Sequence, residues 1–127
     1  MLLLLGMIFL HIVDDYYLQG WLASAKQKEW WQKNAPGKLY KHDYIVALFM
    51  HSFSWSFMIM LIPGIYGWLT NNINSLIILA FALNLGVHML TDHAKANLKV
   101  INLIEDQVVH LAQVYITWFN FVMFTRG

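Results

Sequence analysis

The sequence contains no cysteine and has little charge. Without thiols, the chain can form no disulfide, no thiolate metal site and no cysteine nucleophile. Charged residues make up 12% of its 127 residues, about half the share of an ordinary soluble domain. The net charge of +1 excludes a nucleic-acid-binding protein, which would need a basic face or stripe.

The few charges are confined to short segments. Residues 1–13, 44–91 and 107–125 contain no lysine, arginine, aspartate or glutamate. A helix needs about 20 mostly apolar residues to cross the hydrocarbon core of a bilayer. The pattern therefore predicts an all-α, polytopic membrane protein that forms one transmembrane helical-bundle domain over residues 1–127.

Turn residues divide the longest apolar segment. Residues 44–91 are too many for one span, and they are interrupted at Pro63–Gly64 and again at Asn71–Asn74. We expect a helical hairpin there. Together with the apolar segments at the two ends of the chain, this predicts four transmembrane helices near residues 2–19, 44–62, 75–92 and 101–124.

Lysines in the connecting segments predict the orientation. The segment between the first two spans contains five lysines and the next loop on that side contains Lys95 and Lys99, whereas the opposite side has only Arg126. By the positive-inside rule, we expect both termini to lie outside the cytoplasm. Residues 20–34 mix tryptophan with lysine, which predicts an interfacial helix in the first cytoplasmic loop. The turn residues Asn34–Gly37 should end it.

Histidines and carboxylates recur inside these apolar spans. They are His11, Asp14 and Asp15 in the first span, His51 in the second, His88 and Asp92 in the third, and Asp106 and His110 in the fourth. An ionised residue within a span costs at least about 2.5–3.5 kcal/mol. Such residues face the interior of a bundle, and they indicate a functional site.

The spacing of these residues places them on shared helix faces. His88 and Asp92 are four residues apart, and so are Asp106 and His110. Because the third and fourth spans run in opposite directions, the reversed order of each pair puts both histidines at one depth and both carboxylates at another. We therefore expect a layer of imidazoles beside a layer of carboxylates, nearer the cytoplasmic side.

A divalent metal site explains this arrangement. Imidazole and carboxylate are ligands of Zn²⁺, Mn²⁺ and Fe²⁺ where no thiolate is present, and helical bundles project such ligands inward. The predicted ligands are His11, His51, His88, Asp92, Asp106 and His110, together with Asp14 or Asp15 of the first span. We predict a metal-dependent hydrolase of a membrane lipid or its headgroup. The aspartate of the first span would be a ligand or the general base, and Lys26 and Lys95 would orient the anionic headgroup.

Two other interpretations remain open. A polar stripe on the fourth span, formed by Asp106, His110, Gln113, Thr117 and Asn120, is typical of a transporter or a proton path. Alternatively, the histidines and aspartates only bond one another to lock the bundle of a membrane interaction protein without catalysis.

Three segments carry a resemblance to a known family. They are HIVDDYYLQGWLASAK (His11–Lys26), HMLTDHAK (His88–Lys95) and EDQVVHL (Glu105–Leu111), with His51 in the second span. Over nearly its whole length the chain resembles the small phage and bacterial membrane proteins grouped as domain-of-unknown-function family 3307. The pattern of that family is matched by His11, Asp15, Gln19, Lys26, His51, His88, Asp92, Lys95, Asp106, Gln107 and His110. The resemblance implies a multi-span membrane protein with a site, favours Asp15 over Asp14 as a ligand, and implies no established activity.

Overall fold

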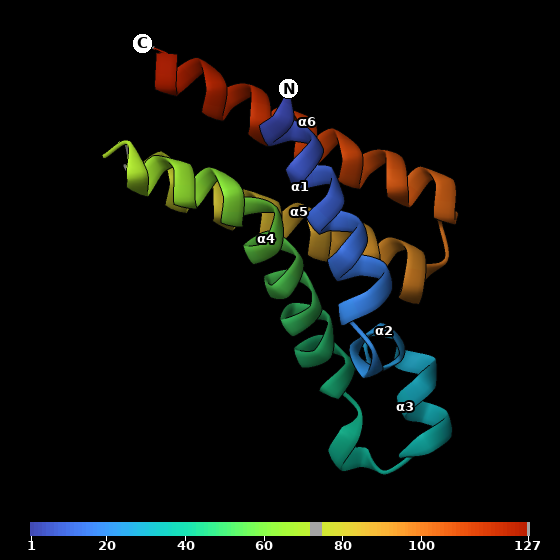
Figure 1. Cartoon of the computed structure of the whole chain (residues 1–127). Coiled ribbons are helices and arrows are strands. Elements are labelled where there is room, and N and C mark those ends of the chain that lie inside the picture. Colours follow the sequence, from blue (N-terminus) through green and yellow to red (C-terminus); the bar gives the residue numbers. More distant parts are fainter. Residues whose placement is uncertain (72–74, 127) are drawn as a thin grey trace.

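The computed structural model describes residues 1–71 and 75–126, which form helices and no strand. The elements are α1 (Leu2–Val13), continued by a π-helical turn (Asp14–Leu18), α2 (Trp21–Ala25), α3 (Lys28–Asn34), a 3₁₀ turn (Lys38–Tyr40), α4 (Asp43–Leu69), α5 (Ser75–His93), continued by a second π-helical turn (Ala94–Leu98), and α6 (Leu103–Arg126) (Figure 1). The prediction of an all-α fold is confirmed.

Three helices in the described part of the chain are long and apolar enough to cross a membrane. These segments are Lys38–Leu69, Ser75–Leu98 and Leu103–Thr125. The first predicted span is also helical, but the 12 residues of α1 and the five of the turn after it extend only about 26 Å. This is slightly less than the hydrocarbon thickness of about 30 Å.

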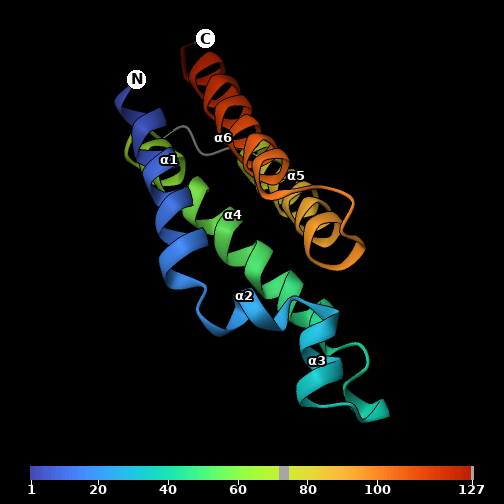
Figure 2. The same ribbon diagram turned by 90° about the vertical axis from the view of Figure 1, so that its right-hand side faces the viewer.

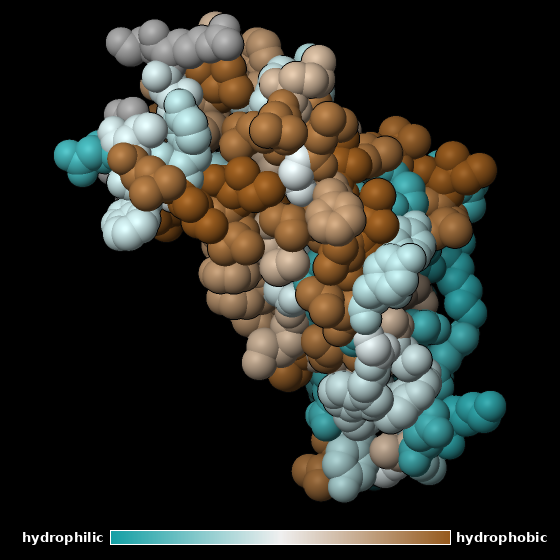
Figure 3. Space-filling model, in the orientation of Figure 1, coloured by the Kyte–Doolittle hydropathy of each residue, from teal (hydrophilic) through white to brown (hydrophobic). Residues whose placement is uncertain are grey.

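The four long helices form one bundle. Helix α1 packs against α4 and α6, and α5 also packs against α4 and α6. Both termini lie at one end of the bundle, whereas α2 and α3 lie at the other (Figures 1 and 2). On the face seen in Figure 3, apolar side chains cover the middle of the molecule, and polar side chains gather near α3 and the connection between α5 and α6. This distribution suits a protein whose middle lies in lipid.

Helix α4 does not end where the sequence predicts. We expect a break at Pro63–Gly64, but the helix continues to Leu69 with Pro63 inside it. Proline lacks the backbone N–H that would bond one turn back, so it weakens and bends a helix, and α4 changes direction along its length (Figure 1). The turn comes later, where Asn71 adopts a φ of 57°. The remainder of the predicted turn, residues 72–74, lies outside the described residues.

The segment predicted as one interfacial helix forms two. Helices α2 and α3 are separated at Lys26 and Gln27, and Gln27 has an extended backbone. The predicted end is confirmed, because α3 stops at Asn34 and Ala35 leaves the helical region. The break allows Lys26 to face the bundle, where it is buried.

The apolar core lies between the predicted histidine layer and the end of the bundle that holds both termini. It contains Met7, Trp55, Ile59, Met60 and Val114. Met7 comes one turn before His11 in α1, and Val114 comes one turn after His110 in α6. Helices α1 and α4 approach closely here, because a Cβ atom on Gly6 would overlap the side chain of Ile62. The core thus holds the four helices together directly beside the polar residues.

Candidate metal centre

The four predicted histidines converge on the interior from α1, α4, α5 and α6. Each is at most 1% exposed. The ring centroids of His88 and His110 lie 4.1 Å apart, and those of His51 and His88 lie 5.1 Å apart. The indole of Trp55 stacks on His88 at 4.2 Å. The expected layer of imidazoles is confirmed.

The carboxylates lie beside these rings. Asp92 and Asp106 are completely buried. Asp92 Oδ2 is 2.6 Å from His51 Nε2, and Asp92 Oδ1 is 3.4 Å from His110 Nε2. Asp106 Oδ1 is also 3.4 Å from His110 Nε2. Asp92 of α5 therefore connects histidines from two other helices.

Five of the seven predicted ligands fall into two overlapping groups. One group is His88, Asp92 and His110, and the other is Asp15, His51 and His88. In each group, one donor atom from every residue lies within 4.8 Å of the others. Ligands about 2.0–2.2 Å from a tetrahedral ion lie about 3.4 Å apart, so small side-chain movements would bring either group to bonding distance.

His88 belongs to both groups and has an unusual environment. Its side chain is completely buried, and neither ring nitrogen has a hydrogen-bond partner among the described residues, although Nε2 lies 3.6 Å from Asp92 Oδ2. Nearly all buried polar atoms in proteins are paired, and an unpaired one needs an explanation. An imidazole nitrogen with a free lone pair among carboxylates suits a metal ligand. The donor set and this environment fit a divalent ion.

His110 is oriented by a neighbour on its own helix. Its Nδ1 pairs with Gln113 Oε1 at 3.3 Å, and Gln113 in turn donates from Nε2 to the Asn84 carbonyl at 3.0 Å. Nε2 faces Asp92 and Asp106, whose carboxylates only accept, so a metal ion bound there would replace the proton that Nε2 donates. Fixing the ring through its other nitrogen is the usual arrangement around metal-binding histidines.

Two predicted ligands lie outside both groups. His11 Nδ1 accepts a hydrogen bond from Trp55 Nε1 at 2.7 Å, and His11 Nε2 pairs with Gln107 Oε1 at 3.2 Å. Both ring nitrogens of His11 are therefore already used. Asp106 Oδ2 accepts from Lys95 Nζ at 2.5 Å and from Gln107 Nε2 at 3.2 Å. His11 and Asp106 border the two groups instead of completing them.

Lys26 places its ammonium inside the cluster. Nζ donates to Asp92 Oδ2 at 2.5 Å and to His51 Nε2 at 2.9 Å, and the residue is only 7% exposed. Asn97 secures this position, because its Nδ2 donates to the Lys26 carbonyl and its Oδ1 accepts from the Lys28 amide. A cation thus already faces two of the candidate ligands.

The two adjacent aspartates at the start of the π-helical turn after α1 point to different places. Asp14 is completely buried and accepts hydrogen bonds from Ser54 Oγ, at 2.7 Å, and from Gln19 Nε2. Asp15 lies 3.6 Å from His51 Nε2 and accepts from Gln107 Nε2 at 3.2 Å. Both occur in the π-helical turn, a form that is rare and frequent at functional sites. The structure places Asp15, and not Asp14, in a candidate ligand group.

A polar cavity opens beside the cluster. It has a volume of about 480 Å³, and its lining includes Asp15, Lys26, Lys95 and Lys99. We call it the polar mouth. The Lys95 side chain is 26% exposed and pairs with Asp106, whereas Lys99 pairs with Glu29 at the surface. All three lysines are paired with carboxylates, so an anionic ligand in the polar mouth would compete with Asp92, Asp106 and Glu29 for them.

Sequence reasoning missed the part played by Trp55. Its indole N–H pairs with His11, its ring stacks on His88, and it also contacts the ring of His110, so one side chain contacts histidines from three helices. Tryptophan in a predicted span is more often an interface anchor, and the sequence contains no signal that this one is buried. Its position follows only from the packing of α4 against α1 and α5.

No known protein family, curated protein or solved structure matches this chain. The resemblance to domain-of-unknown-function family 3307 stays a prediction.

Proposed function

We propose that this chain is a bacterial inner-membrane protein with four spans, whose interior holds a divalent metal ion near the cytoplasmic leaflet. The helical segment Leu2–Leu18 would be the fourth span, slightly thinning the bilayer around it. Helices α2 and α3 would lie in the cytoplasmic interface, since Trp21, Trp30 and Trp31 pack together there among lysines. Both termini, at the opposite end of the bundle, would then be outside the cytoplasm.

The observation that carries the metal proposal is the environment of His88. The completely buried imidazole of His88 has no hydrogen bond at either nitrogen among the described residues, and its Nε2 lies 3.6 Å from Asp92 Oδ2. A buried polar atom without a hydrogen bond costs about 1–3 kcal/mol, and a metal ion bound to one of the two nitrogens would remove that cost there. Zinc, manganese or iron(II) would suit ligands that are all nitrogen and oxygen.

The polar mouth supports a hydrolytic reaction on an anionic substrate. Asp15 lies both in a candidate ligand group and on the lining of the mouth, so it can act as a ligand or accept a proton from an attacking water. Lys95 and Lys26 would position the negative charge of a lipid headgroup. The substrate class that fits is therefore a phosphate-bearing or other anionic lipid of the cytoplasmic leaflet.

Elemental analysis tests the metal centre. The protein would be purified in detergent without chelator from metal-replete cells, together with His88→Ala, His110→Ala and the loop control His42→Ala. We expect stoichiometric metal in the wild type and the control, and its loss in the other two variants. Absence of metal from the folded wild type would contradict the proposal.

An activity assay tests the reaction. The metal-loaded protein would be incubated with phosphatidylglycerol vesicles, and water-soluble headgroup products would be measured. We expect release of products that depends on metal and on Asp15. A metal-loaded protein that releases nothing from phosphatidylglycerol or other anionic lipids would remove the hydrolase proposal while leaving the metal centre.

The position of Lys26 favours a second candidate function. Its ammonium already provides positive charge to Asp92 and His51, as expected if the cluster only locks the bundle of an interaction protein. In that case, the cation of the site is the lysine itself. The two candidates predict different effects of zinc on the stability of the Lys26→Met variant.

A further inference from the structure

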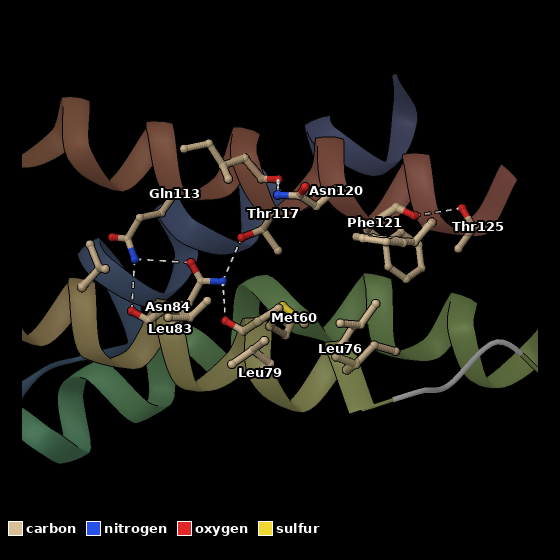
Figure 4. A pocket seen from close by; sticks show the side chains of 15 residues that line it. Met60, Leu76, Leu79, Leu83, Asn84, Gln113, Thr117, Asn120, Phe121 and Thr125 are labelled. Atoms are coloured by element: carbon tan, nitrogen blue, oxygen red, sulfur yellow. Dashed lines mark hydrogen bonds between the residues drawn. The ribbon is translucent and has the colours of Figure 1, made fainter. Parts of the chain in front are cut away.

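A second cavity lies on the other side of the histidine layer. It is a groove of about 390 Å³ between α5 and α6, with Met60 of α4 contributing to its lining (Figure 4). Its walls include Leu79, Leu83 and Ile116, and each of these is more than half exposed. We call it the apolar groove. It extends from Asn84 and Gln113, next to His110, toward Phe124 near the terminal end of the bundle.

The polar side chains of the groove are occupied with one another. Asn84 Nδ2 donates to Thr117 Oγ1 at 2.8 Å, and Gln113 Nε2 donates to Asn84 Oδ1 at 3.3 Å (Figure 4). Asn120 Nδ2 donates to the Ile116 carbonyl in its own helix. A polar solute or a row of water molecules would have to break these hydrogen bonds. An occupant that leaves them intact contacts mainly apolar side chains.

The surroundings of the groove decide which occupant is available. Both helices that form it are long and apolar enough to cross a membrane. The inference rests on the proposed membrane arrangement, in which the open side of the groove would face the bilayer interior. Water is unstable in a cavity with apolar walls, and an empty groove forfeits the close packing of protein interiors. The chain of a neighbouring lipid is the flexible apolar group present on that side.

We infer that the apolar groove binds one hydrocarbon chain of a membrane phospholipid. This lipid chain covers the side of the buried histidines and aspartates that faces the two termini. The polar mouth then remains the access route for water and ions. This lipid site is separate from the proposed metal centre, because its lining contains none of the candidate ligands.

Photocrosslinking in nanodiscs tests the chain site. The bilayer would contain phosphatidylethanolamine and phosphatidylglycerol, with a small share of phosphatidylglycerol carrying a diazirine in one acyl chain. Ala80 lines the groove and is half-buried, whereas Ala82 on the same helix is exposed and outside it. We expect labelling of the groove peptides to fall at least about tenfold in Ala80→Phe and to stay unchanged in Ala82→Phe, because the larger ring overfills the groove.

A second pair of variants keeps the test decisive if Ala80→Phe does not fold. Leu83 lines the groove and Ile78 does not, and both are well exposed. Leu83→Trp should reduce groove labelling and Ile78→Trp should not, while both keep the wild-type thermal unfolding profile. Labelling spread evenly over all lipid-facing helices, or crosslinks joining two copies of the chain through the groove, would overturn the inference.

Discussion

The ammonium of Lys26 lies 2.5 Å from Asp92 Oδ2, although 66 positions separate the two residues in the chain. The contact joins the break between α2 and α3 to the inner face of α5. Asp92 is also the carboxylate that faces His51 and His110. The Lys26 ammonium therefore neutralises the buried charge of Asp92. It also competes with a metal ion for Asp92 and His51.

Replacing Lys26 distinguishes a metal centre from a structural cluster. In Lys26→Met, Asp92 loses its buried partner, which should lower the free energy of unfolding of the metal-free protein by about 3–5 kcal/mol. If the cluster binds metal, removal of the competing ammonium should also tighten zinc binding by at least about tenfold. Thermal unfolding in detergent with and without zinc measures both effects.

The matched control is Lys99→Met, which removes a surface ion pair with Glu29. Surface pairs contribute little, so its unfolding should not change measurably. If zinc fails to restore the stability of Lys26→Met, Lys26 is the resident cation of a structural cluster, and the metal proposal is wrong.

The orientation of His110 by Gln113 leads to a prediction about metal affinity. Gln113→Leu removes the partner of His110 Nδ1 and should weaken metal binding by about 10–100-fold. Asn120→Leu, farther along α6, should leave the affinity unchanged. Zinc titration of the purified variants is the measurement.

The same pair of variants addresses a proton path. A path along the polar stripe would need Asn120 as much as Gln113, so Asn120→Leu would then slow proton flux into liposomes. We expect no such effect, since Asn120 is exposed and bonds within its own helix.

The two neighbouring aspartates of the π-helical turn after α1 should have separable roles. Asp15→Asn is expected to abolish headgroup release, because Asp15 lies in a ligand group and on the lining of the polar mouth. Asp14→Asn should retain activity and lower the free energy of unfolding by about 1–3 kcal/mol, because the buried bonds with Ser54 and Gln19 are disturbed. Activity assays and denaturant unfolding on both variants compare them. Equal loss of activity in two folded variants would contradict this assignment.

Trp55 should stabilise the bundle through its indole N–H. In the native protein, Trp55 Nε1 donates to His11 Nδ1 at 2.7 Å. Trp55→Phe keeps an aromatic ring near His88 but removes this donor. The loss of a buried bond should cost about 1–3 kcal/mol of unfolding free energy. Denaturant unfolding followed by circular dichroism measures it. A variant as stable as the wild type would show that water replaces the indole as the partner of His11.

The sequence was sufficient to predict the helical bundle and most of the cluster. Charge-free segments of span length have few structural solutions, because every backbone polar group in lipid must be bonded within a helix. The four-residue spacing of His88 and Asp92, and of Asp106 and His110, places each pair on one helix face. These local rules explain why the convergence of four histidines could be predicted before any tertiary contact was known.

The same local rules failed at Pro63. Turn propensity predicts an end to the helix there, yet α4 continues to Leu69 because an apolar environment favours helical bonding on both sides of the proline. The ligand groups were also beyond the sequence. The bonds of His11 to Trp55 and Gln107, which use both of its ring nitrogens, join residues from three different helices.

Sequence by itself determined that this chain is helical, apolar in long segments and furnished with imidazoles and carboxylates in two adjacent layers, since periodicity and hydrophobicity act within a single helix. The tertiary structure alone decided that Lys26 reaches Asp92, that Trp55 and Gln107 bond His11, and that α5 and α6 leave a groove between them. Those relationships depend on how the helices are rotated and offset against one another, which is set by side-chain packing between segments far apart in the chain.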